Sequence, residues 1–335
     1  MDDLPLERPG GRVVMVKTVE TKPLISIVMP LFNKADQVRD TIASVQTQTI
    51  DDWELVVVDD GSTDGGGALV ADLEDQRIRI LSQANAGVSA ARNCGIEAAR
   101  SELIAFLDAD DLWHPGFLAT ILELKSDFPE ARWYATAYEI HPAEGKPSIS
   151  RLCGMLGFKR GLLKNYFVLA SRSDPPVWTS AVAVQREAIR LIGNFPVGIG
   201  SGEDLLTWSR LAVRFPLAYD TTPQAIFLIS GIDRMPDPLG LVGNALRALK
   251  DEHQDIAGLN DYLGLWYRMQ AVMAMRFGQS NLARRLAWHS VRSAPTNSRN
   301  VYTLLLAMLP VSTGQKVDHW LRITISKILK KISKP

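Results

Sequence analysis

Residues Ile104–Trp113, with the sequence IAFLDADDLW, decide the fold that this chain can adopt. The mostly apolar first half is typical of a buried strand, and the carboxylates of Asp108, Asp110 and Asp111 follow it directly. Alternate residues of an extended segment point to the same side, so Asp108 and Asp110 can converge on one point. Two carboxylates that close repel each other unless a cation or a proton intervenes. The segment therefore favours a cation site at the end of a strand.

Oxygen-only ligands of this kind suit Mg²⁺ or Mn²⁺, and Mg²⁺ fills the rest of its shell with waters and substrate phosphate oxygens. That chemistry is typical of a site for a nucleotide diphosphate. The same residues also fit an acidic loop that begins a helix, with Asp111 as N-cap before Pro115. Because short acidic motifs recur by chance, the DxD motif alone leaves both interpretations open.

The composition excludes several classes of protein. The 335 residues contain 37 basic and 37 acidic side chains, so no overall positive charge indicates a nucleic-acid partner. The cysteines, Cys94 and Cys153, form no disulfide framework and no zinc motif. The N-terminus lacks the apolar core of a signal peptide, and the best apolar stretch, residues 301–310, is half the length of a membrane span. We expect a soluble or peripheral protein whose chemistry faces the cytoplasm.

Strand and helix patterns alternate after residue 24. Strands are predicted at 25–31, 54–59, 78–81 and 103–107, and helices at 36–48, 68–73, 89–99 and 116–128. Further strands are predicted at 133–140 and 177–184. This alternation indicates an α/β domain with a largely parallel sheet and helices on both faces. Ligands of such sheets bind beyond the carboxyl ends of the strands.

Polar clusters lie at that edge in addition to the DxD motif. The second strand ends in Asp59–Asp64, which also fits a solvated turn with capping residues. Asn85–Asn93 opens a helix with small residues, and its Arg92 could meet a phosphate or form an internal salt bridge. Glu203 and Asp204 open a later helix after three glycines, where capping alone would favour acids. Pro30–Asn33 at the end of the first strand, Asp59–Asp64 and the DxD motif fall on one edge, and three clusters together there indicate a site.

The chain divides into three predicted regions. Residues 1–23 are a flexible arm, residues 24–235 form the α/β domain, and residues 236–335 form a helical C-terminal region. The last segment, 318–335, is a basic amphipathic helix with one tryptophan, Trp320. Such a helix can make a peripheral contact with the inner membrane face, or it can pack on the body as a tail.

Five segments, in this order, resemble the family 2 glycosyltransferases, which are inverting enzymes. They are SIVMPLFNKADQVRDTIASVQTQT, WELVVVDDGSTD, NAGVSAARNCGI, FLDADD and GEDLLTW, and they fall within residues 24–219. The resemblance implies the GT-A (nucleotide-diphospho-sugar transferase) fold, with a mixed, mainly parallel sheet and helices on both faces. The helical C-terminal region is an extension of that fold.

The resemblance also implies roles for particular residues. The nucleotide-sugar site would contain Pro30, Phe32, Asp60, Asn85, Gly87, Arg92, Asp108 and Asp110. Asp110 ranks ahead of Asp108 as the direct ligand of Mg²⁺ or Mn²⁺. Asp204 matches the acid that serves as catalytic base, with Glu203 as the alternative. Trp208 and Trp178 would lie at the acceptor site.

The predicted reaction moves one sugar from a nucleotide-sugar donor to a glycan, a lipid-linked saccharide or a protein. UDP-sugars are favoured as donors because they are common in the family. The QxxRW motif of processive polymerising relatives is absent from the sequence, which favours single addition. Two other interpretations are a non-catalytic nucleotide-binding scaffold and a sugar-phosphate nucleotidyltransferase. The latter typically carries a Gly-rich, basic loop where this chain has Pro30–Lys34.

Overall fold

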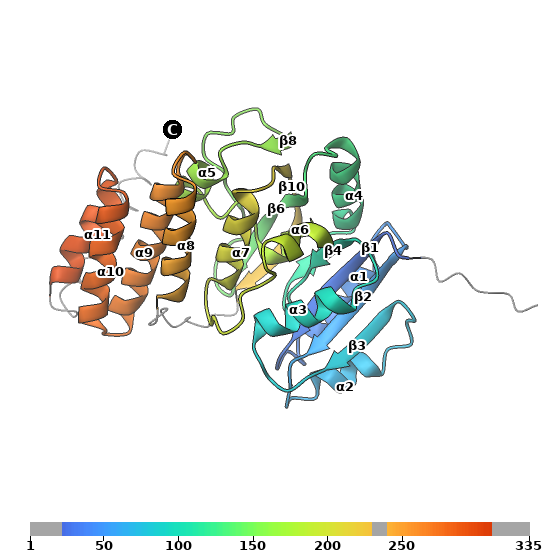
Figure 1. Ribbon diagram of the computed structural model, residues 1–335. Helices are drawn as coiled ribbons and strands as arrows, with labels where there is room; N and C mark the ends of the chain where they lie inside the picture. The colour runs from blue at the N-terminus through green and yellow to red at the C-terminus, as the bar shows by residue number, and fades with distance from the viewer. Residues whose placement is uncertain (1–21, 230–239, 310–335) are drawn as a thin grey trace, which may run out of the picture.

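The computed structural model describes residues 22–229 and 240–309 (Figure 1). The strands are β1 (Ile25–Leu31), β2 (Trp53–Asp59), β3 (Ile78–Ser82), β4 (Leu103–Phe106), β5 (Leu112–Trp113), β6 (Trp133–Pro142), β7 (Ser148–Ile149), β8 (Arg160–Leu163), β9 (Val182–Gln185) and β10 (Leu217–Ile229). The helices of the first range are α1 (Val38–Gln46), α2 (Gly66–Ala71), α3 (Val88–Ala98), α4 (Phe117–Asp127), α5 (Tyr166–Arg172), α6 (Arg186–Leu191) and α7 (Glu203–Ala212). The second range contains α8 (Leu241–Glu252), α9 (Leu259–Arg276), α10 (Ser280–Ser293) and α11 (Ser298–Met308).

One sheet organises the described part of the α/β domain. Its order is β3-β2-β1-β4-β9-β6-β10-β5, with β7 beside β6 and β8 beside β10. The strands β3, β2, β1 and β4 are parallel neighbours, and β6 is parallel to β10. Strand β9 runs antiparallel to β4 and β6. The mixed, mainly parallel sheet is confirmed.

Helices cover both faces of this sheet because its central strands are apolar on both sides. In β1, Ile27 and Met29 belong to a core that also contains Ile42 of α1 and Phe117 of α4. Val28 faces the other way, into a core with residues of α3, α6 and α7. Figure 1 shows α3 and α1 on opposite sides of β1. The helices thus lie on the faces of the sheet, and loops follow β1, β2 and β4 at the carboxyl ends of these strands.

The predicted strand at 177–184 is wrong in its first half. Residues Thr179–Ala181 form a 3₁₀ turn, and β9 begins only at Val182. Asp111 of the DxD loop accepts hydrogen bonds from this segment: from Trp178 Nε1, just before the turn, at 2.8 Å and from Ser180 Oγ at 2.6 Å. These contacts with the DxD loop outweigh the extended preference of an apolar segment.

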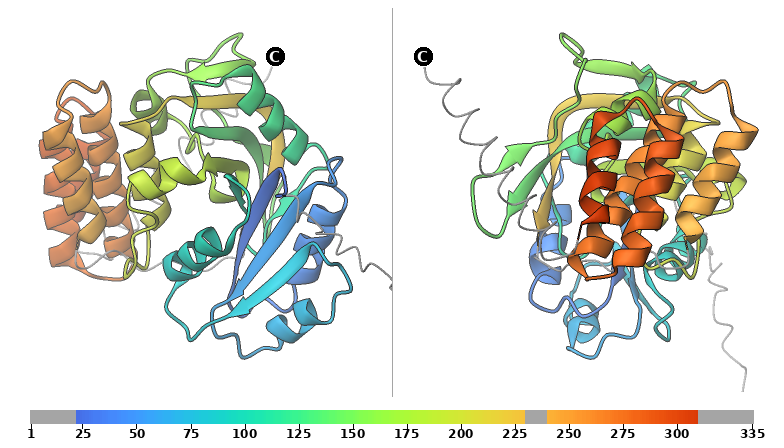
Figure 2. Two further views of the ribbon diagram at one scale, coloured as in Figure 1. Left: turned by 45° about the vertical axis from the view of Figure 1, so that its right-hand side comes forward. Right: turned by 90° about the vertical axis from the view of Figure 1, so that its left-hand side faces the viewer.

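The helical C-terminal region is confirmed for residues 241–308. It joins the α/β domain through a shared core, in which Tyr262 of α9 contacts Phe167 of α5 with ring centroids 5.4 Å apart. Figure 2 shows α10 and α11 at the end of the molecule remote from β1, β2 and β3. None of the helices within the described ranges is long and apolar enough to cross a membrane. The predicted basic helix 318–335 lies outside those ranges, as do most of the predicted arm and residues 230–239, where the predicted α/β domain ends and the helical region begins.

Candidate functional site

A pocket of about 330 Å³ lies at the carboxyl ends of β1, β2 and β4. Its lining includes seven of the eight residues predicted for the nucleotide-sugar site, namely Pro30, Phe32, Asp60, Asn85, Gly87, Asp108 and Asp110. Phe32 is 47% exposed, so an aromatic face is available at the rim. The parallel strands end together at this edge, which is why residues from distant segments meet there.

Two loops of the pocket are fixed to each other by side-chain hydrogen bonds. Asn33 adopts the left-handed region at φ 51°, and its Oδ1 accepts from the Thr63 amide at 2.8 Å. Asp64 accepts from the Ala35 amide at 2.8 Å. Asp59 accepts from the Ser62 amide at 2.9 Å, so Asp59 and Asp64 are turn-forming residues. The turn interpretation holds for these two acids, whereas Asp60 between them faces the pocket.

Asp60 shapes the next loop. It is almost fully buried, and its two oxygens accept from the amides of Ala86 and Gly87, both at 2.9 Å. Gly87 has φ 90°, a conformation that favours glycine, and α3 begins immediately after it. Asp60 therefore holds the Asn85–Gly87 segment against the pocket.

Arg92 of α3 connects the two ends of the site. It is buried, donating to Asp108 Oδ1 at 2.7 Å and to Glu203 Oε1 at 3.1 Å. Burial opposes its charge, but the carboxylates of Asp108 and Glu203 raise the pKa of Arg92 above its ordinary value. The internal salt-bridge interpretation of Arg92 is confirmed. The bridge ties the DxD motif to the start of α7.

The two acids that open α7 have different surroundings. Glu203 is paired with Arg92. Asp204 forms no ion pair with any described residue, and its Oδ1 accepts only a local bond from the Leu205 amide at 2.7 Å. The preceding Gly202 has φ 86°, and a Cβ there would collide with the ring of Trp266 in α9. The helical extension therefore packs directly behind the two acids.

Lys34 is a site residue that the sequence analysis did not assign. It lines the pocket, and its Nζ lies 2.6 Å from Asp110 Oδ2. Its place, one residue after Asn33 in the loop that follows β1, was the available signal. Each acid of the DxD motif thus contacts a cation, Arg92 for Asp108 and Lys34 for Asp110.

Asp111 is not the helix N-cap that was the alternative interpretation of this segment. It is buried and also accepts from the Leu228 amide of β10 at 3.1 Å, in addition to its bonds from Trp178 and Ser180. Burial, followed by the charge of Asp108, raises the pKa of Asp111 to about 7. Asp111 anchors the DxD loop to the far half of the sheet.

The two tryptophans predicted for the acceptor site, Trp178 and Trp208, differ in how deeply they are buried. Trp178 is half-buried beside the DxD loop and packs on Phe227 with ring centroids 3.9 Å apart. Trp208 is completely buried in the core, between Trp133 at 6.4 Å and Phe195 at 5.6 Å. The prediction that Trp208 contacts an acceptor is wrong in this structure, because its side of α7 packs on the sheet.

Asp108 and Asp110 would suit a divalent metal that takes only one or two of its ligands from the protein. Among the described residues no cluster of three or more His, Cys, Asp or Glu could hold a metal. Asp108 and Asp110 are oxygen donors that border a pocket, and their side chains are each 24% exposed. Mg²⁺ typically accepts one or two carboxylates and completes its shell with substrate phosphates and water. The donor set therefore suits Mg²⁺ or Mn²⁺ bound together with a diphosphate.

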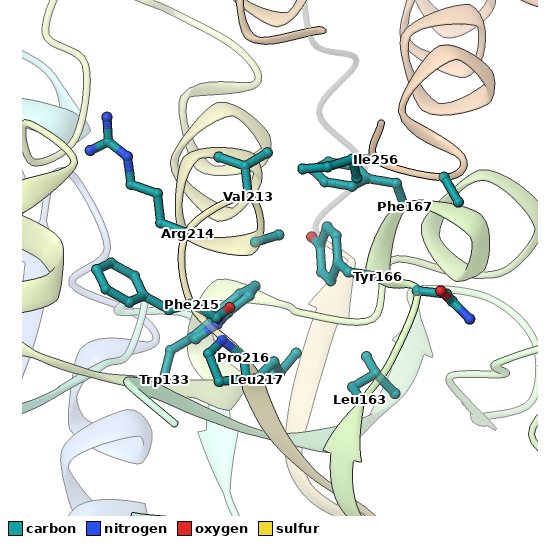
Figure 3. A pocket seen from close by; sticks show the side chains of 13 residues that line it. Trp133, Leu163, Tyr166, Phe167, Val213, Arg214, Phe215, Pro216, Leu217 and Ile256 are labelled. Atoms are coloured by element: carbon teal, nitrogen blue, oxygen red, sulfur yellow. Dashed lines mark hydrogen bonds between the residues drawn. The ribbon is translucent and has the colours of Figure 1, made fainter. Parts of the chain in front are cut away.

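Another pocket, of about 340 Å³, lies at the amino ends of β6 and β10 (Figure 3). Figure 3 shows Val213, Phe215 and Ile256 around it, and none of its described lining residues is acidic. Its cation, Arg214, donates to the Leu191 carbonyl at 2.7 Å. This pocket lacks the groups that the chemistry of the first one requires.

Comparison with known proteins agrees with the geometry. The family model described as Glycosyl transferase family 2 matches residues 26–148. Residues 26–148 therefore match a family 2 glycosyltransferase domain. The putative teichuronic acid biosynthesis glycosyltransferase TuaG of Bacillus subtilis is 36% identical over 129 residues, which are 38% of this chain and 51% of TuaG. An uncharacterized glycosyltransferase of Rickettsia conorii is 29% identical over 71% of this chain and 39% of its own length. The chain thus spans about half or less of these curated relatives.

Solved structures show the fold of the family 2 domain. The structure of S. aureus TarS 1–349 in complex with UDP-GlcNAc has a TM-score of 0.63 and 13% sequence identity, covering 86% of this chain and 90% of that chain. TarS 1–349 in complex with UDP has a TM-score of 0.60 at 14% identity, with the same coverage. The fold is GT-A with a C-terminal helical region, as the sequence predicted.

Proposed function

We propose that this chain is an inverting glycosyltransferase of the hexosyltransferase type. It moves one sugar from a nucleotide-diphosphate donor, a UDP-sugar, to a hydroxyl group of a glycan, a lipid-linked saccharide or a protein. The observation that carries the proposal is the Arg92 bridge between Asp108 and Glu203. It fixes the DxD acids of the pocket next to the acids that open α7.

Asp204 is the proposed catalytic base. An acceptor hydroxyl is a poor nucleophile at neutral pH, so a carboxylate must take its proton as attack proceeds, which typically contributes about 10²–10⁴-fold. Asp204 makes no ion pair within the described ranges, whereas the charge of Glu203 is neutralised by Arg92. Glu203 then acts as a positioning residue. Attack opposite to the leaving nucleotide inverts the anomeric centre in one displacement.

The leaving group develops negative charge on its diphosphate. Asp108 and Asp110 would hold Mg²⁺ or Mn²⁺, which supplies charge neutralisation when bound. Lys34 lines the same pocket and brings a further positive charge to it. Phe32 would offer an aromatic face to the base. Asp60 would bind the nucleoside through Oδ2, which among the described residues accepts from the Gly87 amide alone, whereas Oδ1 already accepts from Gln83 and from the Ala86 amide.

The choice of substrates rests on relatives. TarS, which shares the fold, is described in complex with UDP and with UDP-GlcNAc, and this supports a UDP-sugar as donor. The name of TuaG refers to teichuronic acid biosynthesis, which supports a glycan of the cell envelope as acceptor. Trp178, half-buried beside the DxD loop, is the aromatic side chain proposed for acceptor contact.

A thermal-shift panel with UDP, GDP, CMP and dTDP, each with Mn²⁺, Mg²⁺ or EDTA, tests the proposal. A ligand at 100 times its Kd stabilises by about 2.7 kcal/mol, which is visible in a melting curve. We expect a metal-dependent shift with UDP that Asp110→Ala removes. The corresponding nucleoside triphosphates are tested beside them, and a shift with these, followed by diphosphate release, would instead favour a nucleotidyltransferase. No shift with any nucleotide would contradict the proposal and favour a non-catalytic scaffold that has lost metal-dependent nucleotide binding.

A further inference from the structure

The helical C-terminal region has a charge different from that of the whole chain. Residues 241–309 contain eight Lys or Arg and four Asp or Glu, whereas the chain as a whole is neutral. Part of this positive charge borders a pocket of about 300 Å³ between α8, α9 and α10. Arg247 and Lys250 of α8 face it together with His289 and Arg292 of α10. Among its described lining residues the one acid, Asp251, pairs with Lys250 at 2.8 Å.

The cations of this basic pocket are held in place by their neighbours. Arg247 donates to Tyr267 Oη at 2.7 Å and lies 3.4 Å from His289 Nδ1. Burial and the nearby arginines, Arg247 first, lower the pKa of His289, as expected in a positive field. A planar guanidinium oriented in this way suits a phosphate oxygen. The pocket has the chemistry of an anion site that is separate from the nucleotide pocket.

An arginine stripe on α10 leads from this pocket to an apolar surface. Arg284, Trp288 and Arg292 follow one another at intervals of four residues and therefore share one side of the helix. Arg292 lines the basic pocket, and Arg284 Nε donates to the Ala307 carbonyl of α11 at 3.1 Å. Trp288, between them, is 58% exposed. The stripe thus connects the pocket with α11.

The outer side of α11 is apolar. Val301, Leu305 and Met308 are exposed, and their spacing of four and three residues places them on one face of the helix. Figure 2 (right) shows α10 and α11 at the front when the end of the molecule formed by the helical region faces the viewer. Exposed apolar side chains bordered by arginines and a tryptophan are typical of surfaces that lie on a membrane.

We propose that the α10–α11 end of the helical region binds the surface of an anionic membrane, with the basic pocket receiving the phosphate of a lipid headgroup. The charge of the pocket complements an anionic leaflet, and Trp288 with the apolar face of α11 would contact the headgroup and acyl boundary. The sequence continues directly from α11 with residues 310–335, which contain six Lys or Arg and one Asp. The proposal does not depend on the glycosyltransferase activity, since it uses other residues.

Vesicle co-sedimentation of the full chain tests this surface, with phosphatidylcholine vesicles compared with vesicles that also contain phosphatidylglycerol. We expect binding only to the anionic vesicles. Lys250→Ala and Arg292→Ala should each weaken it about fivefold, because a basic side chain near such a surface contributes about 1 kcal/mol. Trp288→Ser should weaken it about tenfold through lost apolar contact. Arg247 is left intact because it also packs on Tyr267.

Matched controls separate this surface from the general effect of losing one exposed charge or one exposed apolar side chain. Lys125→Ala removes an exposed lysine of α4, and Leu191→Ser removes an apolar side chain that is 59% exposed on α6. Neither should change vesicle binding, and all variants should keep the wild-type melting temperature. Equal vesicle binding by wild type, Arg292→Ala and Trp288→Ser would overturn the proposal. So would binding of inorganic phosphate, measured by calorimetry, without any binding to vesicles.

Discussion

Two carboxylate clusters lie at opposite ends of the same parallel strands. At the amino ends, Glu54 of β2 is fully buried and accepts from Ser26, Arg79 and Arg100. Both of its oxygens have two donors, so the cluster is complete within the protein. A carboxylate saturated in this way can stabilise the fold, but it has no capacity left for a ligand.

At the carboxyl ends of the strands, acids are again paired with basic side chains, but their oxygens are not all occupied by described residues. Asp108 and Asp110 each contact one cation, Arg92 and Lys34, and both acids border a pocket. Their side chains keep 24% exposure, compared with 1% for Glu54. A charged cluster thus indicates function when carboxylate oxygens remain open toward a cavity, and a structural role when every oxygen is satisfied within the protein.

The largest effect is expected at the catalytic base. Asp204→Asn keeps the shape of the side chain but cannot accept the acceptor's proton, so the rate of sugar transfer should fall by about 10²–10⁴-fold. Nucleotide affinity should be unchanged, because the nucleotide pocket lies at the other end of the Arg92 bridge. The measurement is a transfer assay combined with calorimetric binding of the nucleotide. Transfer at the wild-type rate would exclude Asp204 as the base.

Asp110→Asn should act on binding rather than on stability. Changing an outer-shell partner of a metal ligand already costs about 10–100-fold in metal affinity, so loss of a ligand should weaken metal-dependent nucleotide binding at least about 100-fold. The melting temperature without ligand should change little, because Asp110 is partly exposed and paired only with Lys34. Calorimetry with Mn²⁺ measures the first quantity and a thermal melt the second. A large drop in melting temperature with unchanged metal-dependent nucleotide binding would show that Asp110 stabilises the fold and does not bind the metal.

Glu54→Gln should give the opposite result. Breaking a fully buried pair costs about 3–5 kcal/mol, but Arg79 and Arg100 are partly exposed and can be hydrated, so we expect about 2 kcal/mol. Nucleotide affinity should stay at the wild-type value. Urea unfolding and the same calorimetric titration provide the two numbers. A wild-type free energy of unfolding would show that the amino-end cluster is not stabilising.

The contribution of Glu54 should also depend on pH. Burial opposes its ionisation, but the hydrogen bonds from Ser26 and the Arg100 amide, with the charges of Arg79 and Arg100, lower the pKa of Glu54 from its ordinary 4.5. Because the folded-state pKa is the lower one, the contribution is present above pH 4.5 and is lost as the pH falls through the folded-state value. The difference in unfolding free energy between wild type and Glu54→Gln should therefore shrink on acidification from pH 5 to pH 3, as measured in urea. A constant difference over that range would contradict this assignment.

The smallest effect is expected for Lys34→Met. The ammonium group competes with a metal for Asp110 Oδ2, and a partly exposed ion pair is worth about 0.2–1 kcal/mol. Removing it should tighten Mn²⁺ binding in the absence of nucleotide by at most about fivefold. Electron paramagnetic resonance of free Mn²⁺ measures this change. Weaker Mn²⁺ binding in the variant would show that Lys34 supports the metal site instead of competing for it.

The sequence predicted the parallel half of the sheet well, because strands such as β1 and β2 are apolar on both faces and leave no ambiguity. It did not predict β10, in which Asp220–Gln224 interrupts the apolar pattern and the pairing with β6 shifts register. The polar interruption is tolerated because Asp220 pairs with Arg160 of β8 at 2.7 Å. Such long-range partners have no signal in the local pattern.

The candidate site shows the same limit. Pocket residues that directly follow strands, such as Phe32 and Asp108, could be predicted because the strand ends fix their place. Glu203, the second partner of Arg92, lies 111 positions away along the chain. Lys34 follows β1, whereas its partner Asp110 follows β4, 76 positions later. The burial of Trp208 depends on the rotation of α7 against the sheet, which a resemblance to other sequences does not specify.

Calorimetric titration of UDP into the wild-type protein, with Mn²⁺ and then with EDTA, shows whether the DxD acids bind a metal together with the nucleotide. If Asp108 and Asp110 are open oxygens that bind a metal with the diphosphate, UDP should bind at least about tenfold more tightly with Mn²⁺ than with EDTA. Equal affinity in both conditions would contradict the account, because the DxD acids would then be a closed ion-pair cluster like that of Glu54.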